Sequence, residues 1–260
     1  MAWMWALLLT VLAMTSGAVG ANSGRAHLSV VGATSVLAYL RRAVPEWERN
    51  HPGYTVSLSG GGSVAGLVEV SQGRASLAVS DIPPREEWTG SKPLVAVPLG
   101  RLPVVFIVNQ TVPARAVRVK TLRALLAGRE TTWPRTRVPV VVMTRPLASG
   151  ALQVVRWRVL GGQRLSPRAI VQLSNGAMLA AVRETPGAIG FLETGRVPAG
   201  VRTLAIDGRE YSARSPADWS YFSTPTLYYR VDASPEVRDL AQFLASRGFR
   251  AQYGITGDAS

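Results

Sequence analysis

Short apolar segments of alternating hydrophobicity are each followed by a longer amphipathic segment through the first hundred residues of this chain. Alternation over a few residues is typical of β-strands, and apolar residues every three to four positions are typical of helices. Strands are predicted at 27–31, 54–58 and 75–79, with helices at 36–50 and from the glycine loop after the second strand to about residue 72. This β-α-β-α-β order implies a parallel, doubly wound sheet whose strand-to-helix loops gather at one edge.

A second run of predicted strands and helices begins after residue 100. It includes an apolar strand at 138–143, a strand at 201–206 and a helix at 150–160. Extended stretches near residues 100 and 225 connect it to the first unit, and a helix at 235–247 returns the chain there. The pattern therefore predicts an α/β protein with two lobes: residues 22–100 with 225–260 form lobe 1, and residues 101–224 form lobe 2.

The first 21 residues form an apolar run that has no charge before Arg25 and ends in small residues. Such a run is typical of a secretory signal peptide, here with cleavage near Gly20 or Ala21. Its first residues lack a basic side chain, so an uncleaved membrane anchor is the alternative. The chain has no cysteine, which excludes disulfides, thiolate metal sites and a cysteine nucleophile.

The net charge is +13, and arginine far outnumbers lysine. A strongly basic protein favours anionic partners such as phosphate, nucleic acid or an acidic surface. The basic residues are spread along the sequence without forming a stripe, so a solvated surface is the alternative, and we expect no nucleic-acid partner.

Three strand-to-helix loops share one chemistry, since each places glycine or small hydroxyl residues where a helix begins. A helix N-terminus offers unpaired N–H groups and about half a positive charge, so it suits an oxyanion. Ordinary helix capping by Ser or Thr is the alternative for each loop taken alone. The loops are Gly32-Ala33-Thr34-Ser35, Gly60-Gly61-Gly62-Ser63 and Arg145-Pro146-Leu147-Ala148-Ser149-Gly150, the last with an arginine able to bind an anion through two hydrogen bonds.

Asp81 ends the third predicted strand at the same sheet edge and is negatively charged. A carboxylate beside an anion site makes sense if the ligand carries a proton to donate, as monohydrogen phosphate does and sulfate does not. The alternative is that Asp81 caps the turn before Ile82-Pro83-Pro84.

Two enzyme hypotheses compete with a binding site. Residues 60–65 fit the dinucleotide pattern G-x-G-x-x-A after a strand, with Asp81 about 20 residues further on, but this pattern leaves the other two loops unexplained. The same segment lacks the final glycine of a G-x-S-x-G nucleophile elbow. Because His27 and His51 are the only histidines, we expect no hydrolase, no metal site and no cofactor.

The three loops, in this order, resemble those of the periplasmic phosphate-binding proteins of phosphate ABC transporters, in the type II periplasmic-binding-protein superfamily. Gly32-Ala33-Thr34-Ser35 is similar to the family's G-S-T-S, and Gly60 to Gly66 is similar to G-x-G-S-x-A-G. Further similar segments are Val79-Ser80-Asp81, Leu126-Ala127-Gly128 with Trp133, Arg145 with Ala148-Ser149-Gly150-Ala151, Ser174-Asn175-Gly176-Ala177, and Thr185-Pro186-Gly187-Ala188-Ile189-Gly190-Phe191.

The resemblance implies two doubly wound mixed sheets joined by hinge strands, which close on dehydrated phosphate. It implies a periplasmic, monomeric, non-enzymatic receptor that delivers phosphate to ABC permease subunits in the inner membrane. The site residues carried over are Thr34, Ser35, Ser63, Asp81, Arg145, Ser149 and Gly150, with Ser63 and Ser149 donating hydroxyls, Arg145 supplying charge and Asp81 accepting the ligand's proton.

Three alanines depart from the family pattern: Ala33 replaces a serine, Ala148 a glycine and Ala151 a threonine. A hydrogen-bond donor lost from a closed site costs on the order of 1–3 kcal/mol. Weaker phosphate binding, another oxyanion or a scaffold without a ligand therefore remain alternatives.

Overall fold

The computed structural model describes residues 25–195, 199–212 and 214–246. The predicted signal peptide (1–21) and the end of predicted lobe 1 (247–260) lie outside these residues. Among the helices described, none is long and apolar enough to span a membrane.

The first sheet has five strands in the order β2-β1-β3-β13-β4. β1 pairs with β2 and β3 in parallel, whereas β13 comes from the far end of the chain and runs antiparallel between β3 and β4. The sheet is therefore mixed. Its strands are β1 (Ala26–Gly32), β2 (Tyr54–Gly60), β3 (Leu77–Ser80), β4 (Leu94–Pro98) and β13 (Thr226–Arg230).

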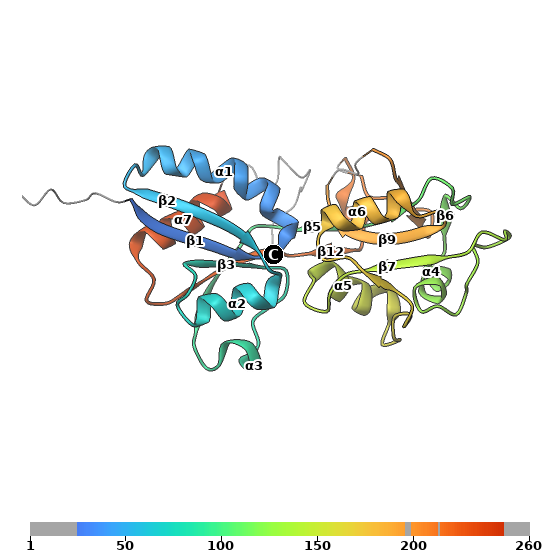
Figure 1. Ribbon diagram of the computed structural model, residues 1–260, viewed down its shortest axis with the longest axis horizontal. Coiled ribbons are helices and arrows are strands. Elements are labelled where there is room, and N and C mark those ends of the chain that lie inside the picture. Colours follow the sequence, from blue (N-terminus) through green and yellow to red (C-terminus); the bar gives the residue numbers. More distant parts are fainter. Residues whose placement is uncertain (1–24, 196–198, 213, 247–260) are drawn as a thin grey trace, which may run out of the picture.

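Helices cover both faces of this sheet (Figure 1), because its central strands alternate their side chains between two apolar cores. Leu77 and Val79 of β3 pack on the side of α1 and α7, and Ala78 packs on the side of α2. The helices are η1 (Thr34–Val36), α1 (Leu37–Asn50), α2 (Ser63–Ser71), α3 (Glu86–Thr89) and α7 (Pro235–Ser246).

The second sheet has the order β10-β5-β9-β7-β8, and β12 also pairs with β5. β7 runs parallel to β9 and β8, while β5 runs antiparallel to β9. Its strands are β5 (Leu102–Val108), β7 (Val141–Thr144), β8 (Ile170–Val171), β9 (Ala188–Glu193), β10 (Arg202–Thr203) and β12 (Phe222–Ser223).

The helices of this second unit also lie on both faces. Val104 and Phe106 of the fully buried strand β5 pack toward α4 and α5, while Val105 and Ile107 pack toward α6. The helices are α4 (Val119–Leu126), α5 (Gly150–Val154), η2 (Val155–Leu160), α6 (Asn175–Glu184) and the short η3 (Pro216–Asp218).

Two predicted elements of the second unit differ in detail. The helix expected at 150–160 changes at Val155 from an α-helix into a π-helix. The strand expected at 201–206 is split around buried Leu204 into β10 and β11 (Ala205–Ile206), and β11 joins β6 (Ala116–Val117) in a separate two-stranded sheet.

The chain passes between the two sheets twice, at 99–101 and at 224–225 (Figure 1). These crossings lie side by side, because the backbone N–H of Leu99 donates to the carbonyl of Pro225 at 2.9 Å. The two sheets are thus joined by a pair of short strand connections.

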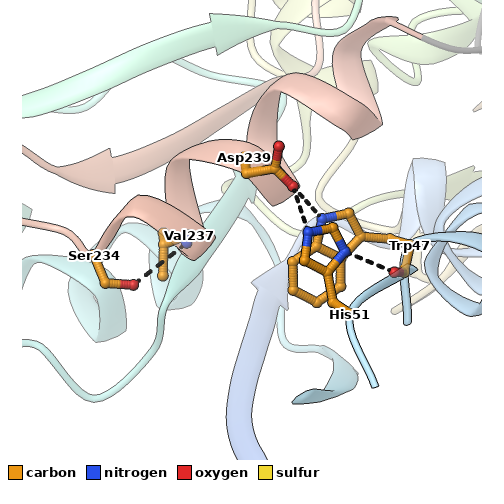
Figure 2. A network of polar contacts seen from close by, with 5 residues as sticks. All are labelled: Trp47, His51, Ser234, Val237 and Asp239. Carbon is orange, nitrogen blue, oxygen red and sulfur yellow. Dashed lines mark hydrogen bonds and ion pairs between the residues drawn. The ribbon is translucent and has the colours of Figure 1, made fainter. Parts of the chain in front are cut away.

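A polar network fastens the C-terminal helix α7 to α1 (Figure 2). The indole N–H of fully buried Trp47 donates to Asp239 at 2.6 Å, and His51 stacks on Trp47 with its Nε2 3.3 Å from the same carboxylate. This network holds the returning end of the chain against the first unit.

Candidate functional site

The three glycine and hydroxyl loops meet at one pocket of about 270 Å³ between the two sheets. Five of the seven predicted site residues line the pocket, and the other two, Ser35 and Gly150, contact Asp81 directly behind its wall. The pocket-lining residues are Ala33, Thr34, Gly61, Gly62, Ser63, Asp81, Arg145, Pro146, Ala148, Ser149 and Leu173.

Two glycines allow the first two loops to approach each other. A Cβ on Gly66, in the first turn of α2, would lie 2.5 Å from the carbonyl oxygen of Val31 on β1. Gly32 has a φ of +142°, and a Cβ there would lie 2.0 Å from the carbonyl oxygen of Val79. Glycine at these positions therefore brings the N-terminus of α2 against the end of β1.

The hydroxyl side chains at these loops do not cap the helices. Ser149 is the N-cap residue of α5, yet its side chain makes no capping hydrogen bond, and the N-caps of α1 and α2 make none either. Ser174, by contrast, accepts from the N–H of Ala177 and caps α6 in the ordinary way. Helix capping does not account for the hydroxyls at the pocket.

Asp81 is held from two sides. Its carboxylate accepts from the hydroxyl of Ser35 at 2.9 and 3.1 Å, and its backbone N–H donates to Ser63 Oγ at 3.0 Å. Because Ser63 Oγ accepts this bond, its own proton is free to be donated elsewhere. The following turn is held by Ser80, whose Oγ bonds both the N–H and the carbonyl of Ile82, so the turn-cap role considered for Asp81 belongs to Ser80.

Arg145 reaches across the pocket from the second unit and is only 6% exposed. Its Nη1 donates to Asn175 Oδ1 at 2.7 Å, and its Nη2 makes a long 3.4 Å bond to Thr34 Oγ1 on the first unit. The amide of Asn175 donates in turn to the backbone carbonyl of Glu193 at 3.0 Å, which fixes the orientation of the arginine.

Glu193, 3% exposed, is a site residue that the sequence analysis missed. Its Oε1 accepts the N–H of Ala151 in the first turn of α5 at 2.6 Å. The available signal was its position: Glu193 ends the apolar strand β9, which runs parallel to β7, so its side chain lies at the same sheet edge as Arg145.

Three buried side-chain atoms in the described part of the chain lack a hydrogen-bond partner, and all three belong to this site. They are Arg145 Nε, Ser149 Oγ and Glu193 Oε2. Buried polar atoms are normally paired, so two orphaned donors beside one pocket indicate a place built to hold an acceptor-rich group.

The electrostatics of the site are set by two carboxyls and one guanidinium. Burial and, after it, the charge of Glu193 raise the pKa of Asp81 to about 8, against the opposing effects of the Ser35 hydrogen bond and of Arg145. Burial likewise raises the pKa of Glu193, and it lowers the pKa of Arg145. The site therefore retains a proton on a carboxyl near neutral pH more readily than an exposed carboxyl would.

The two units are in contact at this site. A Cβ on Gly150 would lie 2.0 Å from the Cβ of Asp81, so only glycine lets the start of α5 reach the end of β3. Among the described residues, no three His, Asp or Glu side chains are grouped to hold a metal ion. The arrangement offers hydroxyl, guanidinium and helix N–H donors facing one carboxyl, which suits a small protonated oxyanion.

Comparisons of the sequence and of the structure with known proteins agree on one family. The PBP superfamily domain model matches residues 17–247. The phosphate-binding protein PstS of Bacillus subtilis (strain 168) is 22% identical over 239 residues, which cover 89% of this chain and 79% of the relative.

Solved structures share the fold. A putative phosphate ABC transporter substrate-binding protein from Clostridium perfringens, with bound phosphate, superposes with a TM-score of 0.80 at 17% identity, over 89% of this chain and all of the other. An ABC-type phosphate transport receptor from Vibrio cholerae superposes with a TM-score of 0.70 at 21% identity, over the same shares. The chain therefore belongs to the PBP superfamily and adopts the two-lobed fold of type II periplasmic binding proteins.

Proposed function

We propose that this protein is an extracytoplasmic solute-binding protein that captures inorganic phosphate for an ABC importer. The observation that carries the proposal is the pair of orphaned buried donors, Ser149 Oγ and Arg145 Nε, which lie beside a pocket that Asp81 also lines. The names of the relatives agree with it.

Each residue has a separate task in the proposed complex. Arg145 supplies positive charge, Ser63 and Ser149 donate hydroxyl protons, and the N-termini of α2 and α5 add backbone donors. Asp81 forms a hydrogen bond with the ligand that needs one proton, which either partner can bring. Monohydrogen and dihydrogen phosphate bring this proton themselves, whereas sulfate must take it from Asp81, so above about pH 8 sulfate would leave a charged carboxylate against an oxygen that has no proton.

The alanines that replace hydroxyl residues of the family pattern limit the affinity for phosphate. Ala33 lines the pocket and brings no hydroxyl where the family pattern has serine, and Ala151, whose N–H already donates to Glu193, brings none where the pattern has threonine. Each missing donor weakens binding by about 1–3 kcal/mol, so we expect a weaker receptor than one with serine and threonine at these positions.

The wider role follows from the same proposal. Residues 22–100 with 225–260 and residues 101–224 would act as two lobes that close about the crossings at 99–101 and 224–225. The monomeric protein would be exported to the periplasm by residues 1–21 and would present its closed form to permease subunits in the inner membrane.

Calorimetric titration with phosphate and then sulfate tests the function. We expect saturable phosphate binding that Ser63→Ala weakens by about tenfold or more, since a donor to a charged group is lost. Ser91→Ala, which removes an exposed serine hydroxyl far from the pocket, is the matched control and should leave binding unchanged. Absence of heat with phosphate in the folded protein would contradict the proposal.

The same titration tests two alternative functions, binding of other oxyanions and binding of a dinucleotide. Sulfate binding equal to phosphate binding at about pH 9, where Asp81 has lost its proton, would assign the site to oxyanions in general and remove the role given to Asp81. Binding of a nicotinamide dinucleotide would favour the Gly60–Gly62 fingerprint with Asp81, although a pocket of about 270 Å³ lies below the usual size of ligand sites.

A further inference from the structure

The positive charge of the molecule is concentrated in one lobe, although the basic residues look scattered along the sequence. Residues 101–224 contain 18 of the 29 lysines and arginines and 6 of the 16 aspartates and glutamates, a net charge of +12, and the rest of the chain carries +1. Between residues 111 and 182, twelve basic residues accompany a single acidic one, Glu130.

Most of these basic residues lie on or directly after the helices that cover one side of the second sheet. α4, α5 and η2 cover the face opposite to α6 (Figure 1), and α4 is joined to η2 by a bond from Arg123 Nε to the carbonyl of Val159. The loops after these two helices are also adjacent, since Arg129 bonds Gln163 and the N–H of Ser166 donates to Leu126. We call this surface the basic face; its exposed members are Lys120, Arg129, Arg135, Arg137, Arg156, Arg158, Arg164 and Arg168.

Little acidic charge neutralises the basic face. Within the described residues of 101–224, the one ion pair is Arg183 with Glu184, at the end of α6 on the other side of the sheet. The positive potential of the face is therefore directed to its surroundings and favours an anionic partner.

An exposed tryptophan lies among these charges. Trp157 on η2 is 62% exposed and stands between Arg156 and Arg158, whereas Trp47, Trp133 and Trp219 are buried. A π-helical turn of this kind is rare and often occurs at functional sites. An amphipathic indole beside cationic side chains is the combination that anchors proteins at the boundary between lipid headgroups and acyl chains.

We propose that the basic face, with Trp157 inserted, binds the anionic surface of a phospholipid bilayer. Arginines would attract the headgroups, and the indole would enter the interfacial layer. The proposal concerns a surface outside the oxyanion pocket and does not depend on which ligand that pocket binds.

The shape of the charge distribution favours a bilayer over nucleic acid. Single-stranded nucleic acid is bound in a groove that follows its backbone, with several aromatic rings for stacked bases. Here the charges spread over two helices and two loops, and among the described residues of this face one aromatic ring, Trp157, is exposed, so no row of rings is available for stacked bases. The expected export of the chain also separates it from the nucleic acids of the cytoplasm.

Vesicle binding tests the proposal with the chain that begins at residue 22, because the apolar leader would itself bind lipid and every described strand and helix follows residue 24. Co-sedimentation with vesicles of phosphatidylcholine is compared with vesicles containing about one-third phosphatidylglycerol. We expect binding to the anionic vesicles alone. Raising the salt from about 0.1 M to about 1 M, which shortens the screening length from about 10 Å to about 3 Å, should abolish it.

Matched variants assign the binding to this face. Each arginine near an anionic membrane contributes about fivefold to binding, so Arg156→Glu with Arg158→Glu should lower the partition coefficient by at least about 25-fold. Arg41→Glu with Arg42→Glu changes the net charge equally on exposed residues of α1 in the other lobe and should have little effect. Trp157→Ala should remove the blue shift of fluorescence and the quenching by brominated lipid.

Four results would overturn the proposal. They are equal binding to both vesicle types, no binding to anionic vesicles at low salt, equal losses in the two double variants, and an unchanged blue shift in Trp157→Ala. Tighter binding to a single-stranded oligonucleotide than to anionic vesicles would reassign the face to nucleic acid. Circular dichroism checks that every variant is folded.

Discussion

Asp81 and Ser35 show how one side chain sets the chemistry of another. The hydroxyl of Ser35 points at both carboxylate oxygens, yet burial and Glu193 outweigh this bond and raise the pKa of Asp81 to about 8. Asp81 in the ligand-free protein is therefore substantially protonated at neutral pH, and it can donate to a phosphate oxygen as well as accept from a phosphate hydroxyl.

A pH dependence of binding follows from this. The complex holds one proton between Asp81 and the ligand. Monohydrogen phosphate still carries this proton above about pH 8, so phosphate affinity should change little there, whereas sulfate takes the proton from Asp81 and should lose affinity by about tenfold per pH unit. In Asp81→Asn the amide supplies its own N–H, so sulfate affinity should stay constant over this range. Calorimetry over a series of pH values measures the slopes for both ligands, and equal slopes for phosphate and sulfate in the wild type would contradict this role of Asp81.

The buried carboxyl of Glu193 should make the stability of the folded protein depend on pH. Its folded pKa is raised above the unfolded value, so the folded state holds this proton more tightly, and the resulting stability is present at low pH and is lost as pH rises through the folded pKa. Glu193→Gln keeps an acceptor for the N–H of Ala151 and carries no charge. It should raise the melting temperature by several degrees at about pH 9 and change it little at about pH 6.

The control for Glu193→Gln is Glu184→Gln, whose side chain is 71% exposed and should leave the melting temperature unchanged at both pH values. A lower melting temperature for Glu193→Gln at alkaline pH would show that the charged carboxylate stabilises the fold. The phosphate affinity of Glu193→Gln should also rise, since a buried negative charge near the pocket is removed.

Sequence patterns predicted the residues that come together but not their individual roles. Thr34, Ser63, Asp81, Arg145 and Ser149 follow strands whose ends share an edge, so their proximity could be predicted from strand order alone. The role of Glu193 could not be predicted, because it depends on packing that places its carboxylate at the N–H of Ala151.

At the scale of elements, the network of α1 and α7 shows what fixes a terminal helix in place. Asp239→Ala leaves the indole N–H of buried Trp47 without its acceptor and should lower the free energy of unfolding by about 1–2 kcal/mol. The ion pair with His51 adds little to this, because the Asp239 side chain is half exposed.

Chemical denaturation measures this change, and Gln242→Ala on the exposed side of α7 is the matched control. Equal stability of Asp239→Ala and the wild type would mean that water replaces the carboxylate at Trp47. Phosphate binding should be unaffected, since none of the network residues lines the pocket and all of them belong to one lobe.

Elements could be predicted where periodicity is strong, as in α1 and the buried strand β5. The segment at 201–206 contains no turn residue, and only tertiary contacts divide it at Leu204 between two sheets. The π-helical turn at η2 has no distinctive sequence pattern, so the prediction of one continuous α-helix was incomplete there.

At the scale of the whole molecule, Gly150 controls how closely the lobes meet. Gly150→Ala places a Cβ 2.0 Å from that of Asp81, a clash that separation of the lobes relieves. We expect phosphate affinity to fall by about tenfold or more with little change in melting temperature, and small-angle scattering should show a more open molecule.

The contrast variant is Gly66→Ala. Its Cβ would lie 2.5 Å from the Val31 carbonyl within one lobe, so no lobe movement relieves the clash, and stability should fall by about 1–3 kcal/mol. If Gly150→Ala destabilised the protein as much as Gly66→Ala, the lobes would not move independently at this contact.

Strand order has a consequence for the time course of synthesis. β13 lies between β3 and β4, and β4 has no other partner in its sheet, so the first lobe lacks an interior strand until residues 226–230 have left the ribosome. The second lobe is continuous in sequence and needs no later segment to complete its sheet. The N-terminal lobe therefore stays unfinished while most of the chain is made, and its sheet can be completed only after the whole second lobe has been synthesised.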